Sequence, residues 1–233
     1  MLILGLETAG PTASVALMRD GKLLIEHTVH HTRTHSETVM PMVEQLMQEL
    51  HCTADMLNAV ACNIGPGSFT GVRIGVCTAN AMHTALNIPV TGICSLAALY
   101  EKVACYPHEV CAMIDARNDS VYMAVFSSSG EYVQEPSAMN IDACLAMLSN
   151  NTLLVGDAVP VYIEKINQYG LPVAPAQCHM SRAASLCVIA EKQLSAFTKS
   201  PYTEVEPMYL RPSQAERMFA KKHEQGMEEK HGY

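Results

Sequence analysis

The chain has 233 residues, of which 49% are hydrophobic and 16% are charged, and its formal net charge is −8. This length suits one large or two small globular domains, and the negative charge argues against a protein that grips nucleic acid by itself. We expect a cytoplasmic protein for three reasons. No apolar stretch approaches the roughly 20 residues that span a membrane, and the apolar start, which ends at Glu7, has no basic flank of the kind that a signal peptide has. The nine scattered cysteines form no C-x-x-C pair and indicate free, buried thiols.

The first half of the chain predicts three strands followed by alternating helices and strands. Strands are expected over residues 1–6, 13–18 and 23–29, and Asp20-Gly21 between the last two is a strong hairpin signal. A helix follows Thr34, because Thr34 and Glu37 have the spacing of a capping box and apolar residues recur at helical intervals. The half is completed by a strand over 58–63, a helix after Ser68, a strand over 88–93 and a helix from Ser95. The predicted order is βββαβαβα.

The second half repeats this order. The predicted elements are strands over 110–115, 121–126 and 131–135, a helix near 142–149, a strand over 152–156, a helix near 160–168 and a longer helix at about 181–196. Two βββαβα units in tandem imply two similar α/β domains that face each other across a cleft. We therefore assign residues 1–105 to a first domain, 106–212 to a second domain and 213–233 to a polar tail.

A glycine-rich turn joins the strand over 58–63 to the helix that follows it. The order of strand, turn and helix start resembles a phosphate cradle, because free amides at a helix start attract anions. The turn lacks the lysine of a P-loop, since Gly71 is followed by Val72, and Gly71 comes one residue too late after Gly65 and Gly67 for a dinucleotide fingerprint. The pattern indicates a nucleotide-site fold without the reactive groups of a nucleotide site.

The segment from Gly65 to Arg73, Gly-Pro-Gly-Ser-Phe-Thr-Gly-Val-Arg, resembles the bacterial tRNA threonylcarbamoyladenosine biosynthesis proteins of the TsaB (YeaZ) type, as do Ile114-Asp-Ala-Arg117 and Tyr209-Leu-Arg211. The family belongs to the actin, sugar-kinase and heat-shock-chaperone ATPase superfamily. The resemblance implies two tandem domains of the actin-like ATPase (ribonuclease-H-like) fold. It also implies a non-catalytic subunit that pairs with and activates TsaD, a catalytic sister of the same fold.

The resemblance also implies the reaction and the other partners. The sister transfers a threonylcarbamoyl group to the adenosine beside the anticodon in tRNAs that read codons starting with A. A small ATPase, TsaE, joins the pair, and tRNA is reached indirectly through the complex. When the sister is absent, the family forms homodimers. No membrane partner is expected.

The resemblance places a degenerate phosphate site in this chain. Its candidate residues are Glu7, Thr8, Gly65, Gly67, Ser68 and Asp115. Glu7 stands where the family usually has Asp, and the metal-binding His pair of the sister falls at Ser95 and Leu99, neither of which can replace an imidazole. The turns after Glu7 and Asp115 hold one glycine and none, although backbone amides must come close to a phosphate. We expect no catalytic residue, metal or cofactor in this chain alone, with ATP and a metal bound by partner subunits.

Two other function classes stay open. The first is an active ATPase or phosphotransferase of the same superfamily, for which the carboxylates of Glu7 and Asp115 could bind hydrated magnesium. The second is a glycoprotease-like metallopeptidase, for which His31 and His35 have metal-ligand spacing. That spacing is weakened because Thr34 is the expected helix cap, which places His31 before the helix, and because no H-E-x-x-H pattern follows.

Two helices of the first half are candidates for a partner surface. The helix from Ser36 to Leu50 has a wide apolar arc, and the helix from Phe69 to Leu86 is apolar almost all round. The pattern alone favours burial inside the protomer, whereas the resemblance favours docking with a partner. The expected interface residues are Val39, Met42, Val43, Leu46, Gly71, Val72, Gly75, Val76 and Ala79. Replacing Val76 or Ala79 by Arg is then expected to block pairing and to leave the fold intact.

Overall fold

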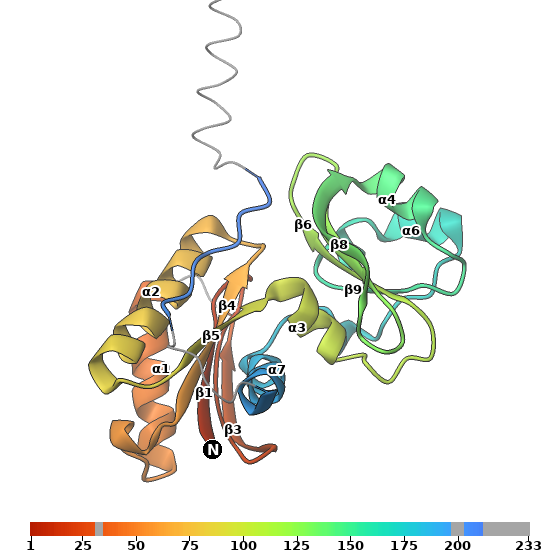
Figure 1. Ribbon diagram of the computed structural model, residues 1–233. Helices are drawn as coiled ribbons and strands as arrows, with labels where there is room; N and C mark the ends of the chain where they lie inside the picture. The colour runs from red at the N-terminus through yellow and green to blue at the C-terminus, as the bar shows by residue number, and fades with distance from the viewer. Residues whose placement is uncertain (31–34, 197–202, 212–233) are drawn as a thin grey trace, which may run out of the picture.

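The computed structural model describes residues 1–30, 35–196 and 203–211 as two α/β halves joined side by side (Figure 1). Thr34, His31 and the expected tail over 213–233 lie outside the described residues. Of the helices in those ranges, none has the length and apolar character needed to cross a bilayer.

The first half contains a mixed sheet whose strand order is β3-β2-β1-β4-β5. Asp20 and Gly21, with φ of 48° and 75°, make the predicted tight hairpin between β2 and β3. β4 lies parallel to β1 and to β5, as helical crossovers require. The elements are β1 (Leu2–Glu7), β2 (Ala13–Arg19), β3 (Lys22–Val29), α1 (His35–Glu49), a 3-10 turn η1 (Ala54–Met56), β4 (Ala59–Gly65), α2 (Phe69–Leu86), β5 (Val90–Cys94) and α3 (Ser95–Glu101).

The second half has a smaller sheet with the order β8-β7-β6-β9. Its elements are β6 (Val110–Asp115), β7 (Ser120–Phe126), β8 (Tyr132–Asn140), α4 (Ile141–Met147), β9 (Leu153–Val155), α5 (Ala158–Val161), α6 (Ile163–Tyr169), a 3-10 turn η2 (Ala176–Cys178) and α7 (Ala183–Ala196). The predicted fold class, two tandem actin-like α/β units, is confirmed. β8 is longer than the strand expected over 131–135, and the helix expected near 160–168 is divided into α5 and α6.

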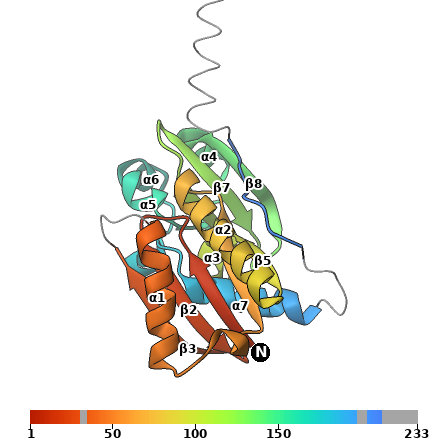
Figure 2. The same cartoon turned by 90° about the vertical axis from the view of Figure 1, so that its left-hand side faces the viewer.

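The last helix returns to the first sheet. α1 and α2 cover one face of that sheet and α7 covers the other (Figures 1 and 2). Leu186 and Cys187 of α7 are buried together with Ile3 of β1 and Ala16 of β2. All six residues of β1 are buried, so both faces of this strand need a covering layer. Residues 183–196, which we expected in the second domain, therefore complete the first half.

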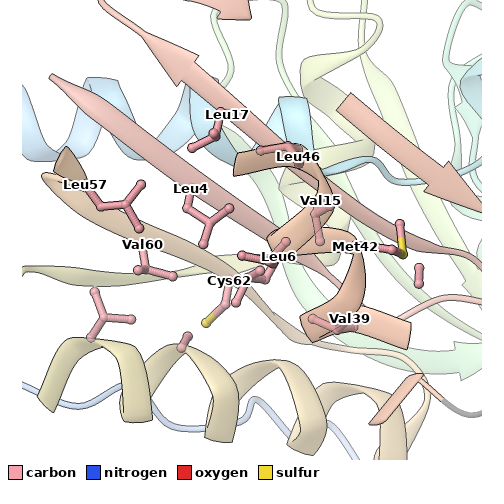
Figure 3. Close-up of a cluster of buried hydrophobic side chains, with 14 of the residues drawn as sticks. Leu4, Leu6, Val15, Leu17, Val39, Met42, Leu46, Leu57, Val60 and Cys62 are labelled. Atoms are coloured by element: carbon pink, nitrogen blue, oxygen red, sulfur yellow. The ribbon is translucent and has the colours of Figure 1, made fainter. Parts of the chain in front are cut away.

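The first core lies between the sheet and its two outer helices. Alternate residues of β1 and β2 point toward α1 and α2, among them Leu4, Leu6, Val15 and Leu17 (Figure 3). The apolar residues that we expected at a partner interface all belong to this core: Val39, Met42, Val43, Leu46, Val72, Val76 and Ala79. Each of them is at most 7% exposed. Their apolar pattern therefore reflects burial within the protomer, and we now expect Arg at Val76 or Ala79 to disrupt the fold instead of leaving it intact.

The nine cysteines are free, as predicted. Five are buried, namely Cys62, Cys94, Cys111, Cys144 and Cys187, whereas Cys77 and Cys105 are exposed. Burial raises the pKa of the Cys62 and Cys187 thiols to about 12, so both stay protonated and act as small apolar side chains.

Candidate functional site

A small cavity lies between the two halves, at the position where the sequence predicts a nucleotide site. Glu7, Asn63, Ser95 and Ser181 line it from one side, and Asp157 lines it from the second half. Its volume is about 30 Å³, which is room for roughly two water molecules. Glu7 was predicted at this place because it ends the first strand, and Ser95 and Leu99 also reach the cavity.

The Glu7 carboxylate is held by groups of this chain. It is 1% exposed. Its Oε1 accepts a hydrogen bond from Ala9 N at 2.8 Å, and its Oε2 accepts from Asn63 Nδ2 at 2.6 Å and from Ser181 Oγ at 2.5 Å. Burial raises the pKa of the Glu7 carboxyl, and the hydrogen bonds from Ser181, Asn63 and Ala9 oppose that rise. Both carboxylate oxygens are thus already committed to protein donors.

Asn63 extends this network to two further elements. Its Oδ1 accepts from the backbone N of Gly65 at 2.8 Å and from Ser95 Oγ at 2.7 Å. Ser95 begins α3, and Ser181 lies just before α7, so the network joins β1, β4, α3 and the approach to α7. Within the described residues, no buried side-chain nitrogen or oxygen lacks a hydrogen-bond partner. Sequence reasoning missed Asn63 and Ser181 as partners of Glu7.

Gly71 and Gly75, two glycines that we expected at a partner interface, lie against the turn after β1. A methyl group on Gly71 would overlap the carbonyl oxygen of Thr8, and one on Gly75 would overlap the Thr8 hydroxyl. Thr8 Oγ1 donates a hydrogen bond to the Gly71 carbonyl at 2.7 Å. Gly71 and Gly75 thus let the turn after β1 of the same chain come close to α2.

The remaining candidates fix the start of α2 against the same turn. Ser68 N donates to the Ala9 carbonyl at 2.8 Å, and Ser68 Oγ caps α2 by accepting from Gly71 N at 3.2 Å. A methyl group on Gly67 would overlap the Ala9 carbonyl. Gly65 has φ of 101°, a left-handed value that suits glycine. These residues therefore pack a helix start tightly against β1.

The second predicted acid has a different environment. Asp115 Oδ1 accepts from Arg117 N at 2.9 Å and from Tyr162 Oη at 3.3 Å, and Arg117 forms an ion pair with Oδ2 at 3.2 Å. Asp115 is not among the residues that line the cavity, whereas Asp157, at the end of β9, is. Burial raises the pKa of the Asp157 carboxyl. β9 lies parallel to β6, so the ends of both strands lie at the same edge of the sheet. Asp157 follows β9 as Asp115 ends β6, and this position after a strand was the signal that could have identified it.

These residues do not fit a bound nucleotide or its metal. Both carboxylate oxygens of Glu7 accept hydrogen bonds from the chain itself, and the backbone amides of Gly65 and Gly71 donate to Asn63 Oδ1 and Ser68 Oγ, so these groups are not directed at a phosphate. Within the described ranges, no three His, Cys, Asp or Glu side chains gather as a metal site. His35 is already engaged, because its Nε2–H donates to the Gly10 carbonyl at 3.0 Å.

The outward surfaces of α1 and α2 carry a second candidate site. Four of the exposed residues of α2 recur at intervals of four, namely Phe69, Arg73, Cys77 and Ala81, and Thr70, Thr84 and Ala85 are exposed as well. On α1, Met40 is 49% exposed. Arg73 is the only lysine or arginine in either helix, and α1 holds Glu37, Glu44 and Glu49. This face has the apolar and small residues that suit close helix packing, with one cation at its edge.

The chain is similar to proteins of one family. The family model described as "TsaD: tRNA N6-adenosine threonylcarbamoyltransferase" matches residues 26–219. The chain is 31% identical over 126 residues to the tRNA threonylcarbamoyladenosine biosynthesis protein TsaB of Bacillus subtilis, a match of 54% of this chain and 55% of that relative. It is 29% identical over 229 residues to TsaB of Haemophilus influenzae, covering 91% of this chain and 94% of the relative.

Solved structures agree with the fold. A Pseudomonas aeruginosa protein described as similar to peptidase YEAZ superposes with a TM-score of 0.78 at 25% identity, covering 90% of this chain and 99% of that chain. The activator of 2-hydroxyisocaproyl-CoA dehydratase from Clostridium difficile, solved with bound ADPNP, superposes with a TM-score of 0.54 at 8% identity, covering 86% and 100%. The second likeness concerns the fold alone.

Proposed function

This chain belongs to the tRNA N6-adenosine threonylcarbamoyltransferase (TsaD) family as a member of its TsaB (YeaZ) type, and we propose that it serves tRNA threonylcarbamoyladenosine biosynthesis as a non-catalytic subunit. It pairs with the catalytic sister TsaD and activates it for transfer of the threonylcarbamoyl group to tRNA. The ATPase TsaE is a further partner, and ATP and the metal are bound by the partner subunits. The chain reaches tRNA only through this complex.

The observation that carries the proposal is the internal closure of the nucleotide cleft. Glu7 accepts three hydrogen bonds from the chain itself, and the start of α2 packs its glycines on the turn after β1. A ligand that displaced these partners would break three hydrogen bonds of a buried carboxylate. These contacts support a subunit that contributes a rigid surface, because a preformed surface loses less conformational entropy on binding.

We place the partner surface on the outward faces of α1 and α2. The residues that can reach a partner are the exposed ones, Met40 on α1 and Phe69, Arg73, Cys77 and Ala81 on α2. The buried residues named from the sequence act behind this face by holding both helices on the sheet. The same face would serve the homodimer that forms when the catalytic sister is absent.

Reconstitution of tRNA modification tests this function. The reaction would contain the catalytic subunit, the ATPase, an adenylate-forming enzyme, threonine, bicarbonate, ATP and tRNA, with this chain either present or replaced by an unrelated protein. We expect modified tRNA only when the chain is present, and neither modification nor ATP hydrolysis by the chain alone. Modification that is unchanged by its omission would contradict the proposal. Binding of Mg-ATP with turnover by the isolated chain would instead support the ATPase alternative.

A further inference from the structure

The segment 203–211, here called the C-terminal strap, bridges the two halves along α2 (Figure 1, dark blue). Asn80 of α2 exchanges two hydrogen bonds with Val205, each at 3.0 Å. Met208 N donates to the Ile64 carbonyl at 2.7 Å, and the Arg211 guanidinium lies 5.9 Å from the ring centroid of Tyr122 on β7. The strap is therefore fixed on the first half and reaches the second half. In the sequence, only the resemblance carried by Tyr209-Leu-Arg211 marked this segment.

The docked strap completes a cluster at the start of α2. The rings of Phe69 and Tyr209 stack with their centroids 5.0 Å apart. The Arg73 guanidinium carbon lies 3.9 Å from the Phe69 centroid, and Arg73 Nε donates to Tyr209 Oη at 2.8 Å. Phe69 and Tyr209 are nevertheless 38% and 46% exposed. Arg and Tyr are among the residue types that dominate binding energy in protein interfaces, and Phe is enriched there, so these contacts hold three such side chains at the surface.

We propose that the strap is part of the partner surface, and that Phe69, Arg73 and Tyr209 form the anchor on which the catalytic sister docks. The inference rests on the proposed function and adds the strap to its surface. Cation–π and hydrogen-bond contacts already restrict the three side chains, so little rotamer entropy remains to be lost on binding. α2 alone supplies two of the three residues, and the third is present only while the strap is docked.

The chemistry of the anchor defines what it takes from the partner. Arg73 donates one hydrogen bond within the described residues, from Nε to Tyr209 Oη, and its two terminal nitrogens have no hydrogen-bond partner there. Two unpaired terminal nitrogens can bind a carboxylate through two parallel hydrogen bonds. The anchor therefore fits an acidic side chain flanked by apolar residues on the sister subunit.

The same groups could also stack an RNA base, but the surroundings favour a protein. The chain has a net charge of −8, and the exposed Glu204 and Glu206 lie on the strap itself. Backbone phosphates need several cations to displace their counterions, whereas α1, α2 and the strap together hold two, Arg73 and Arg211.

The test measures affinity for the purified catalytic subunit by isothermal titration, using the full-length chain. Arg73→Ala and Tyr209→Ala should each weaken pairing by about tenfold or more, as truncation of an interface hot spot does. Arg73→Lys should also weaken it, because lysine keeps the charge and loses the planar fork. Asn80→Ala should weaken pairing because it releases the strap. Lys192→Ala, which removes an exposed cation on α7, is the matched control and should pair like the wild type.

Thermal unfolding of each variant separates a lost contact from a lost fold, and the anchor variants should melt within a few degrees of the wild type. Wild-type affinity in both Arg73→Ala and Tyr209→Ala would overturn the anchor and leave the proposed function intact. Weakened tRNA binding by the assembled complex, with unchanged pairing, would overturn it in favour of an RNA contact. Absence of pairing by the wild type would overturn both proposals.

Discussion

Gly71→Ala tests whether the glycine motif is a packing device of the chain itself. Alanine stabilises a helix by about 1 kcal/mol relative to glycine. Here, however, its methyl group would overlap the buried carbonyl oxygen of Thr8 and lie 3.2 Å from Cδ2 of His35. A backbone carbonyl cannot rotate away, so α2 must shift, at an overpacking cost of about 1–3 kcal/mol. The shift also breaks the hydrogen bond from Thr8 Oγ1 to the Gly71 carbonyl, which contributes about 1 kcal/mol.

The net loss is therefore about 2 kcal/mol, or roughly 4–8 °C in melting temperature for a chain of this size. Gly75→Ala is the matched control, because its methyl group would overlap a side-chain atom, the Thr8 hydroxyl oxygen, and would meet its other neighbours at ordinary contact distance. Turning the Thr8 side chain about its Cα–Cβ bond sacrifices one hydrogen bond, about 1 kcal/mol, which the gain in helix propensity of about 1 kcal/mol offsets. Urea and thermal unfolding would measure both variants. Equal stabilities for the two, or a Gly71→Ala variant as stable as the wild type, would refute the packing argument.

Three further substitutions probe the cleft and the core. Ser181→Ala removes a charge-assisted hydrogen bond to Glu7 and should lower the unfolding free energy by about 2 kcal/mol in urea titrations; unchanged stability would contradict the network. Because burial raises the folded-state pKa of Glu7 above its unfolded value, Glu7 adds stability below the unfolded pKa that is lost as pH rises through the folded pKa. Glu7→Gln should flatten that decline when melting temperature is followed against pH, and an unaltered profile would assign the decline to other groups. Val76→Arg buries an unpaired charge and should cost about 3–5 kcal/mol, so circular dichroism should report lost folding; a folded variant that fails to pair would restore Val76 to the interface.

Much of the fold was predictable because hydrophobic periodicity and turn residues act locally. Asp20-Gly21 defined the first hairpin, and Ser68 was correctly placed before α2. The layer occupied by α7 was not predictable from the helix itself, since its apolar stripe does not specify which sheet it covers. The informative signal was in β1, where six consecutive buried residues require cover on both faces.

The candidate site was predictable only in part. Glu7 could be placed at the cleft because it ends a strand, but its partner Ser181 is 174 residues away in sequence, and such a contact leaves no local pattern. For the helices, an apolar arc does not distinguish a core from an interface, and here the arc is the core. The exposed positions of α2, such as Arg73 and Cys77, are better candidates for a partner face, because their side chains are not part of the core.

α2 joins the two sites because its opposite sides serve different purposes. One side places Gly71 and Gly75 on the turn after β1 and so closes the cleft, while the other presents Phe69 and Arg73 to solvent. Its position is therefore set by contacts that form when the chain folds and need no ligand. The strap reinforces the same position, since Met208 binds Ile64, the residue directly after Asn63 of the cleft network. A helix fixed from both sides offers a partner a preorganised surface, which lowers the entropy cost of the docking that we propose.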